Sequence, residues 1–477
     1  MKALLFLAAI PLAAQYDVVI SGGRVMDPAS GLNAVRHIGI RGGKIAAVSA
    51  TPLQGKVVLR AEGRVVAPGF IDLHAHGQTN EANEYQAHDG VTTALELEVG
   101  VPHVAEYLKA RSGNSILNFG ATAGHGAARA MAARDFTPQP VSGGSGVETM
   151  AYVNVSKYKE LKEPEEFTKL AAELERGMRE GALGVGMAHQ YYPGASREEI
   201  FKVFQMAARW KMPIFAHVRS MSVDAMQEVI ADAAATGAAL HIVHVNSMSL
   251  AALPLVLELI DAAHKRGMDI TTEAYPYTAA STLLESTMFD EGWQQRLGIS
   301  YGELQWVKTG ERLTKETFEK YRKETGQVIM HFMKAEWIER AMASPFVMVA
   351  SDGMPFAPGA HPRSAGTFSR VLGYYVRERK ALGLMEAIGK MTIMPARRLE
   401  AIAPAMKNKG RIQVGADADI TVFDAAKVKD MATFEKGLAF SAGIDHVVVN
   451  GVAVVQDGAT VKGARPGKAV TGNFGSR

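Results

Sequence analysis

Eight short apolar runs, separated by helical stretches, follow one another between residues 68 and 400, and this alternation constrains the fold more than any other feature. Strands that alternate with helices predict parallel pairing, and eight such units predict a closed (β/α)8 TIM-like barrel. A chain of 477 residues with 47% hydrophobic content can bury a core of that size. The runs are FIDLHAH, VTTALELE, SILNFGATAG, GALGVGM, MPIFAHV, ALHIVHV, DITTEAYPY and FVMVASDG.

Both ends of the chain have a different pattern, in which short apolar runs alternate with Gly-Gly, Asp-Pro and similar turns. Residues 16–67 and 401–477 are each too short to close a core. We therefore predict one small β-sandwich built from both chain ends, with the barrel of residues 68–400 inserted between them. Residues 284–344 exceed a usual connection, so we expect them to cap the barrel mouth. The stretch VSGGSG, Val141 to Gly146, is typical of a flexible loop.

The N-terminal residues MKALLFLAAIPLAA have the layout of a short secretory signal, with one lysine before an apolar run and small residues at its end. We expect residues 1–15 to be a signal peptide, cleaved after Ala14, and the protein to be periplasmic or secreted. The alternative is a buried first strand in a cytoplasmic protein. The run is too short to span a bilayer, and no later segment reaches the roughly 18 uninterrupted apolar residues of a spanning helix.

The formal net charge is only +3 and charged residues make up 21% of the chain, which argues against nucleic acid or an anionic membrane surface as a partner. The chain has no cysteine, and this excludes disulfides and thiolate metal ligands. A nucleophile elbow, an HExxH run and a dinucleotide fingerprint are all missing from the sequence. The sequence does not fix the oligomeric state.

Polar residues gather at the ends of the predicted barrel strands. His74 and His76 stand two apart, so strand alternation points both of them inward. Glu96 and Glu98 share one face of an apolar strand, where carboxylates are costly to bury unless a cation or hydrogen bonds compensate them. Because the carboxyl ends of barrel strands face one mouth, we expect these groups to meet there.

Three further strand ends supply His217, His244 and Asp352. Nitrogen and oxygen donors of this kind suit zinc best, with other divalent metals as alternatives. Asp352 is the candidate for a base that accepts a proton from water activated by one or two such ions. By contrast, we expect His241 to be a hydrogen-bonded core residue and His125 to have a structural role.

The run PGFIDLHAH, followed far along the chain by SDG, resembles the amidohydrolase superfamily. The motifs SDGMPFAPGAHPRSAG, KMTIMPARRL, GADADITVFD and GARPGK narrow the resemblance, and they are similar to those of the N-acyl-D-amino-acid deacylases, or D-aminoacylases. Upstream, GHGAAR, YYPGASREE and EAYPYTAAST fit the same family. The resemblance covers nearly the whole chain after the predicted signal peptide.

The resemblance implies roles for individual residues. His217 and His244 match the family's tight-site zinc ligands, His74 and His76 its first-strand pair, and Asp352 its catalytic aspartate.

Four more positions match groups near the substrate. Tyr275 is expected to polarise the scissile carbonyl, and Ser281 to lie beside the substrate. Arg363 and Tyr191 resemble residues that hold the substrate's carboxylate.

The sequence departs from the family at three places. The family usually supplies a cysteine at the end of the second strand; here Glu98, or alternatively Glu96, takes that place as a metal ligand. A carboxylate bridges two metals readily, so a binuclear site becomes more plausible than in relatives. Asn246, which we count among the substrate-binding positions, replaces a lysine that often meets the substrate carboxylate, and HAHGQ lacks the acidic residues that commonly follow the histidine pair.

These observations predict a zinc-dependent amidohydrolase that cleaves N-acyl-D-amino acids, or dipeptides with a C-terminal D-residue. Its substrate is a small molecule. Two alternatives stay open: a cyclic amidase or L-dipeptidase of the same superfamily, and a barrel that has lost catalysis and serves as a scaffold.

Overall fold

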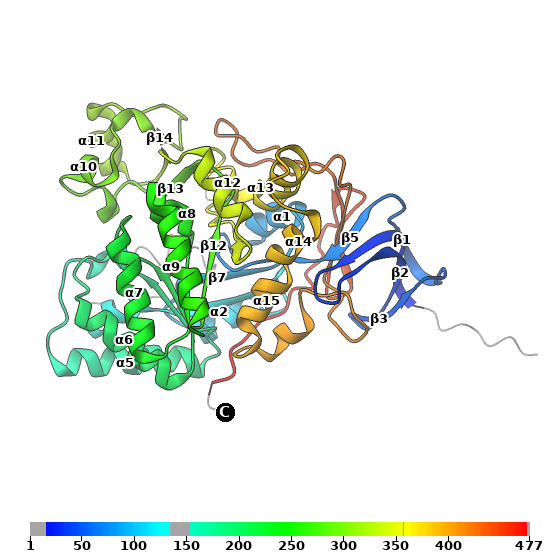
Figure 1. Cartoon of the computed structure of the whole chain (residues 1–477), viewed down its shortest axis with the longest axis horizontal. Helices are drawn as coiled ribbons and strands as arrows, with labels where there is room; N and C mark the ends of the chain where they lie inside the picture. The colour runs from blue at the N-terminus through cyan, green and yellow to red at the C-terminus, as the bar shows by residue number, and fades with distance from the viewer. Residues whose placement is uncertain (1–15, 134–152, 356, 475–477) are drawn as a thin grey trace, which may run out of the picture.

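A computed structural model describes residues 16–133, 153–355 and 357–474 (Figure 1). The predicted signal peptide and the predicted loop Val141 to Gly146 lie outside these residues. Two parts are evident in Figure 1: a strand-and-helix barrel in the centre and left of the view, and a sheet at the right that contains β1, β2, β3 and β5.

Eight parallel strands form the barrel, in the order β16-β12-β11-β10-β9-β8-β7-β6. All eight runs predicted from the sequence contribute one strand each. The ring closes between its ends, where Ala75 pairs with Gly353 and His76 N donates to Gly353 O at 3.0 Å. The strands are β6 (Phe70–Asp72), β7 (Val91–Val101), β8 (Asn118–Gly124), β9 (Val185–Ala188), β10 (Ile214–His217), β11 (Leu240–Ile242), β12 (Ile270–Ala274) and β16 (Val347–Val349).

Helices surround the barrel, and several begin at a side chain that caps the first turn. Thr79, Ser196 and Ser222 each accept a hydrogen bond from a backbone N–H of the helix that follows. The helices of the barrel are α1 (Asn80–His88), α2 (Val104–Arg111), α3 (His125–Ala132), α5 (Pro164–Arg179), η1 (His189–Tyr191), α6 (Arg197–Trp210), α7 (Val223–Thr236), α8 (Val245–Ser249), η2 (Leu250–Ala252), α9 (Leu253–Lys265), α12 (Ala335–Ala343), α13 (Arg363–Arg370), η5 (Val371–Glu378), α14 (Leu384–Met391), α15 (Ile393–Glu400) and η6 (Pro404–Asn408).

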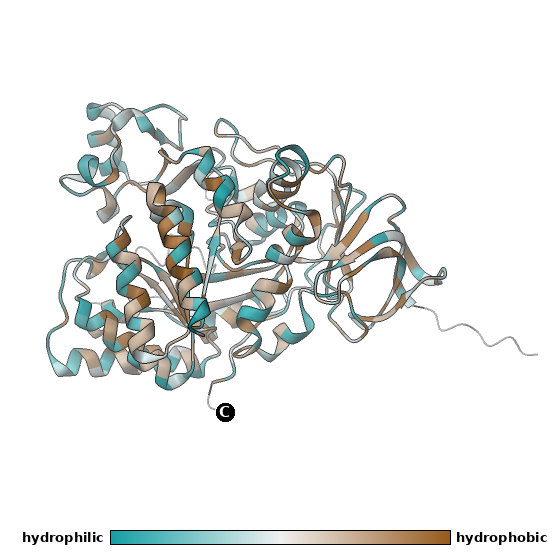
Figure 2. Cartoon of the chain, in the orientation of Figure 1, coloured by the Kyte–Doolittle hydropathy of each residue, from teal (hydrophilic) through white to brown (hydrophobic). Residues whose placement is uncertain are grey.

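One helical stretch among the described residues, Val245–Lys265, is long and apolar enough to cross a membrane by length and composition. Its mean hydropathy is 1.4, and 50% of the apolar window is buried inside the protein. It consists of α8, η2 and α9, and Figure 2 shows much of the α9 ribbon in the hydrophobic colour. Val256 and Ile260 of α9 are buried. A core helix of a barrel passes the same test.

Both chain ends join one nine-stranded sheet, in which β17 pairs antiparallel with β5 from Ile420 opposite Pro68 to Phe423 opposite Val65. Ile20, Ile38 and Val448 are buried in its own apolar core. The prediction of one small β domain built from both ends is confirmed. Its strands are β1 (Tyr16–Asp27), β2 (Leu32–Arg41), β3 (Lys44–Ser49), β4 (Gly55–Arg60), β5 (Val65–Pro68), β17 (Ile420–Phe423), β18 (Ile444–Val449), β19 (Val452–Gln456) and β20 (Ala459–Thr460).

The segment predicted as a cap, 284–344, has different bounds in the structure. A three-stranded sheet in the order β13-β15-β14 begins earlier, at Ala279. The last predicted cap helix, α12, contacts β12 and β16 and belongs to the barrel layer. The insertion contains β13 (Ala279–Leu283), η3 (Thr287–Phe289), α10 (Trp293–Leu297), η4 (Tyr301–Glu303), β14 (Leu304–Trp306), α11 (Lys315–Glu324) and β15 (Gln327–His331).

The last described residues leave the nine-stranded sheet, although the sequence placed them in the β-sandwich. Gly467 N donates to Ser115 O at 2.8 Å, and Val470 N donates to Phe119 O at 2.7 Å. Because Phe119 lies at the start of β8, the tail closes the end of the barrel opposite the mouth.

Candidate metal centre

Five histidine and carboxylate side chains meet Asp352 at the mouth of the barrel. They come from positions at or just after the C-terminal ends of five strands, as expected for barrel residues that face a common site. The residues are His74 and His76 after β6, Glu98 in β7, His217 at the end of β10, His244 after β11, and Asp352 after β16.

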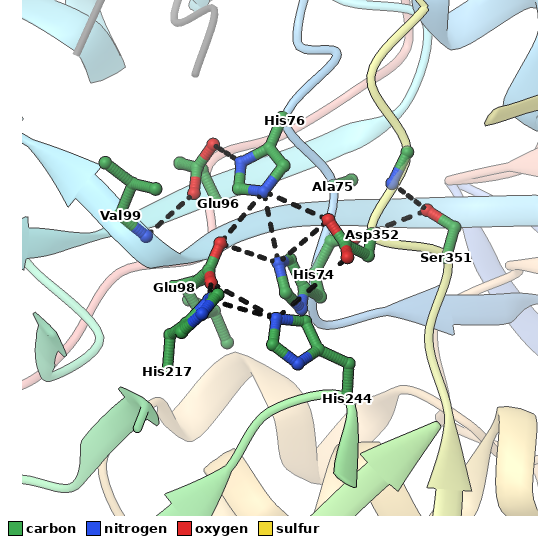
Figure 3. Close-up of polar contacts among 12 residues, drawn as sticks. His74, Ala75, His76, Glu96, Glu98, Val99, His217, His244, Ser351 and Asp352 are labelled. Atoms are coloured by element: carbon green, nitrogen blue, oxygen red, sulfur yellow. Dashed lines mark hydrogen bonds and ion pairs between the residues drawn. The ribbon is translucent and has the colours of Figure 1, made fainter. Parts of the chain in front are cut away.

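The first ligand group combines two histidines with two carboxylates (Figure 3). His74 Nε2 and His76 Nε2 lie 3.1 Å apart, and each lies 3.0 Å from Glu98 Oε2. Asp352 Oδ1 lies 3.5 Å from His74 Nε2 and 3.4 Å from His76 Nε2. All four side chains are buried. Their donor atoms therefore surround a single point.

The second ligand group uses the other oxygen of Glu98. His217 Nδ1 contacts Glu98 Oε1, and His244 Nε2 lies 3.3 Å from the same oxygen. The two histidine nitrogens are 3.1 Å apart. Glu98 thus joins both groups, with one oxygen directed to each pair of histidines.

The outer nitrogen of His74 is fixed by a buried carboxylate that the sequence analysis did not single out. His74 Nδ1 donates to Glu273 Oε1 at 2.7 Å, and Glu273 Oε2 accepts from His241 Nε2 at 3.2 Å. Burial alone would raise the pKa of Glu273, but His74 and His241 lower it to about 2. His241 is the hydrogen-bonded core residue that we expected. A carboxylate in the apolar run ITTEAYPY was the available signal for Glu273.

His76 is oriented by Glu96, and this separates the two glutamates of β7. His76 Nδ1 donates to Glu96 Oε2 at 2.8 Å, while Glu96 Oε1 accepts from Val99 N at 3.3 Å. The pairing of β7 with β8 shifts in register after Glu96. Of the two glutamates, Glu98 alone belongs to the two ligand groups.

Gln190 of η1 holds His217, and the sequence analysis missed this residue. His217 Nε2 donates to Gln190 Oε1 at 2.6 Å, so the lone pair of His217 Nδ1 faces Glu98 Oε1. A polar residue directly before Tyr191 was the only signal for it. Such outer partners fix the tautomer and the ring orientation of metal-binding histidines.

The cluster fits divalent cations by its own chemistry. With Nδ1 of His74 and His76 donating outward, their Nε2 lone pairs face each other and Glu98 Oε2, an arrangement that repels itself unless positive charge lies between the atoms. Burial would lower the pKa of His74, but the charges of Asp352, Glu98 and Glu273 raise it well above its ordinary value. The donor set thus demands a proton or a cation, and imidazole with carboxylate is a set that suits zinc.

Asp352 is held against the cluster by the backbone and by an arginine. Its φ of 51° lies in the left-handed region, which a non-glycine residue rarely adopts. Asp352 N donates to His74 O at 2.8 Å, and Arg363 Nη1 forms an ion pair with Asp352 Oδ2 at 2.9 Å. Burial raises the pKa of Asp352, but Arg363 and His74 outweigh it and hold the pKa below its ordinary value. The carboxylate is therefore ionised.

A second buried carboxylate anchors the loop that carries Asp352. Asp72 Oδ1 accepts from Ser351 N at 3.0 Å and from His74 N at 3.1 Å, and Asp72 Oδ2 accepts from Ser351 Oγ at 2.5 Å. Burial raises the pKa of Asp72 to about 6. These bonds tie the ends of β6 and β16 together where the barrel closes.

A cavity of about 560 Å³, its mouth included, opens onto both ligand groups. Five methionines line it, together with hydroxyl groups of Tyr191, Ser247, Tyr275, Ser281 and Thr282. The Tyr275 hydroxyl and Ser281 Oγ are buried and have no hydrogen-bond partner among the described residues. Burial raises the pKa of Tyr275, so its hydroxyl stays protonated and can donate to a ligand.

The residues predicted to bind substrate fall into two groups. Tyr191, Ser281 and Tyr275 line the cavity, and Tyr191 Oη lies 3.0 Å from Thr282 Oγ1. Asn246 and Arg363 are fully buried behind the cavity and are not part of its wall.

Those two residues support Tyr275 from behind. Asn246 Nδ2 donates to Tyr275 O at 3.2 Å. The guanidinium of Arg363 lies 4.5 Å from the centre of the Tyr275 ring, and Arg363 Nη2 donates to Ser281 O at 3.2 Å. In this structure neither side chain is positioned to meet a ligand directly.

Comparisons with known proteins show which family the chain resembles. The family model described as Amidohydrolase family matches residues 58–455. The chain is 31% identical over 485 residues to the N-acyl-D-glutamate deacylase of Alcaligenes xylosoxydans xylosoxydans, a match that covers 92% of this chain and 93% of that protein.

Two solved structures resemble the chain over 96% of its length and 100% of their own. The N-acyl-D-glutamate deacylase of Bordetella bronchiseptica, complexed with zinc and a phosphonate mimic of the tetrahedral intermediate, aligns with a TM-score of 0.82 at 26% identity. A D-aminoacylase with a binuclear metal centre aligns with a TM-score of 0.80 at 26% identity.

Proposed function

Because the chain belongs to the amidohydrolase family, we propose that it is a zinc-dependent hydrolase that cleaves the amide bond of N-acyl-D-amino acids. Relatives that cover nearly the whole chain support this substrate class, since one acts as an N-acyl-D-glutamate deacylase and another as a D-aminoacylase. Resemblance to a deacylase structure that holds zinc and a mimic of the tetrahedral intermediate supports the reaction type.

The observation that carries the proposal is the position of Glu98. Its two oxygens face two separate histidine pairs, His74 with His76 and His217 with His244, so the chain itself supplies ligands for two ions. Zinc bound there supplies Lewis-acid polarisation of a carbonyl and lowers the pKa of water toward about 7.

Asp352 moves the proton in the proposed reaction. Its ionised carboxylate lies beside both ligand groups, where it accepts a proton from the attacking water and returns it to the leaving amine. The ion pair with Arg363 keeps the carboxylate oriented toward the centre.

Tyr275 stabilises the negative charge that develops on the carbonyl oxygen. Tyr275 lines the cavity, where Ser247 and Arg363 face its hydroxyl oxygen, and its protonated hydroxyl has no acceptor within the described residues. A donor fixed in a buried site before reaction is worth more than the same donor in water.

The cavity wall favours an apolar group on the substrate. Met248, Met330 and Met354 line it with Leu283 and Val99. Methionine adapts to irregular apolar shapes, so this wall suits a D-amino acid with an aliphatic or thioether side chain.

The test is a substrate panel combined with metal analysis. We expect purified protein to contain zinc and to release the amine from N-acetyl-D-leucine faster than from N-acetyl-L-leucine, with hydantoins unreactive. Turnover of hydantoins alone would identify a cyclic amidase. A folded, metal-free and inactive protein would identify a scaffold.

We also infer that the protein is exported, because the N-terminal run has the layout of a secretory signal. Expression of the full chain in a bacterium, followed by sequencing of the mature N-terminus, tests this. An intact Met1 in a cytosolic fraction would exclude export.

A further inference from the structure

A second hollow adjoins the metal-binding cavity. Met221 and Met288 line both spaces, so the two lie on opposite sides of this methionine pair. With the open solvent at the mouth included in both cases, the second hollow has about 1110 Å³ of empty space, compared with about 560 Å³ for the cavity.

Two arginines, Arg219 and Arg296, line the hollow, whereas none lines the metal-binding cavity. The other side chains around the hollow include Ser220, Ser222, Thr287 and Asp290 beside Met221, Met288 and Leu297. Hydroxyl and guanidinium groups bind the carbonyl oxygens and amide groups of a peptide backbone, whereas an alkyl chain forms no hydrogen bond with them.

The two arginines of the hollow are not equivalent. Arg219 is clamped by Glu228, with Nε donating to Oε2 at 3.1 Å and Nη2 donating to Oε1 at 2.8 Å. Arg296 is exposed and bonds to backbone carbonyls, including Asp290 O at 2.9 Å. Within the described residues, no ion pair neutralises Arg296. Its guanidinium therefore keeps its charge unpaired, and the N–H groups that do not donate to Glu291 O, Met288 O and Asp290 O are available to a ligand.

The hollow lies beside the His217 side of the metal centre. Gln190 lines it and also binds His217 Nε2. In Figure 3, His217 and Asp352 lie on opposite sides of the ligand cluster. The leaving amine must lie near Asp352, which returns the proton to it. The acyl group therefore extends toward His217 and Gln190.

We propose that this hollow is a subsite for a peptidyl acyl group, and that the enzyme's preferred substrates are oligopeptides whose C-terminal residue is a D-amino acid. The inference rests on the proposed function and names its substrate class. Water adds across the last amide bond, and the products are the free D-amino acid and the shortened peptide with a new carboxylate.

The experiment compares acetyl-Ala-Ala-D-leucine with acetyl-D-leucine on the zinc-loaded enzyme. Both substrates release D-leucine, so the ratio of their kcat/KM values isolates the contribution of the hollow. We expect the peptide to be preferred by at least about 10-fold, because a charge-assisted hydrogen bond and several neutral ones are added. In Arg296→Ala this ratio falls toward about 1, and Arg296→Lys restores part of it.

Arg312→Ala is the matched control. Arg312 is exposed like Arg296 and bonds to a backbone carbonyl, Glu303 O, in the same insertion, but it does not line the hollow. It should leave the ratio at the wild-type value. Equal turnover of both substrates by wild type, a preference that survives Arg296→Ala, or an equal loss in Arg312→Ala would overturn the subsite. Failure to hydrolyse either substrate would instead overturn the proposed function.

Discussion

The two ends of the barrel both bury carboxylates, but they satisfy them in opposite ways. At the base, Asp419 Oδ2 accepts from Lys409 Nζ at 2.7 Å and from Asn118 Nδ2 at 3.0 Å. At the mouth, Glu98 and Asp352 face histidine nitrogens. The base is thus complete within the chain, whereas the mouth is complete only with cations. Carboxylates that are equally buried therefore stabilise the fold at the base and bind cations at the mouth, and their partners distinguish the two roles.

Backbone contacts of the C-terminal residues also distinguish the base of the barrel from its mouth. Gly467 lies so close to β8 that a Cβ atom would be 2.0 Å from Leu117 O, and its N–H donates to Ser115 O. The base is therefore sealed by backbone contacts that tolerate no side chain. Long connections and an inserted sheet instead surround the mouth, where they leave room for a ligand.

Asp352→Asn, at the mouth, should have the largest effect, because it should lower activity without lowering stability. The amide cannot accept the proton, so we expect kcat on N-acetyl-D-leucine to fall by about 10²–10⁴-fold. Zinc content and melting temperature should stay close to wild type, because the other ligands remain. Steady-state kinetics, elemental analysis and thermal unfolding measure these quantities. A kcat within tenfold of wild type would remove Asp352 from the mechanism.

Asp419→Ala should produce the reverse effect. It leaves the buried Lys409 with Asp417 alone and removes one of the three acceptors of Asn118 Nδ2, so we expect a loss of about 3 kcal/mol in the free energy of unfolding. The kcat of the folded fraction should not change. Urea unfolding checks the stability, with Asp17→Ala at an exposed ion pair as a control that leaves the midpoint in place. A lower kcat with normal stability would contradict the assignment of the base.

Lys390, near the base of the barrel, should make the free energy of unfolding depend on pH. Burial lowers the pKa of Lys390 from 10.5 to about 8, and its Nζ donates to Ser344 O and Val347 O near the start of β16. Between these values the unfolded chain binds more protons than the folded one, so stability should rise with pH by up to about 3 kcal/mol. Urea unfolding from pH 7.5 to 10.5 tests this. If the free energy of unfolding of Lys390→Met rises with pH as steeply as that of the wild type, another group is responsible for the pH dependence.

Glu273→Gln should have the smallest effect, on metal binding alone. The amide weakens the hydrogen bond that orients His74, so we expect zinc affinity to fall by about 10–100-fold. Competition with a chelator measures it. Glu96→Gln is the matched variant for His76 and should behave alike. Unchanged affinity in both variants would show that the ring positions are fixed by packing.

The fold was predictable because its signals are local and repeated. Each of the eight apolar runs became a barrel strand, and β17 joined β5 as two incomplete β segments require. The tail after β20 was misplaced, since its few backbone contacts with Ser115 and Phe119 have no counterpart in hydrophobic pattern. The insertion began at Ala279 and not at 284, because β13 pairs with β15, which is distant in sequence.

The site was predictable only as far as strand geometry fixes it. Five of the six residues in the two ligand groups were identified from the sequence, and Glu98 was one of two alternatives, since strand ends of a barrel share one mouth. The outer partners Glu273 and Gln190 were not identified, because their role depends on which ring nitrogen they meet. Asn246 and Arg363 were assigned to substrate, yet they lie behind Tyr275.

The amino-acid order by itself determined the barrel and the convergence of imidazoles and carboxylates, because alternation and strand direction are properties of the chain. Only the tertiary structure decided between Glu96 and Glu98. Both occupy one face while the ladder is regular, but the register of β7 against β8 shifts after Glu96. One carboxylate then turns to His76 Nδ1 and the other to the centre, and a break in hydrogen-bond register leaves no mark in residue spacing.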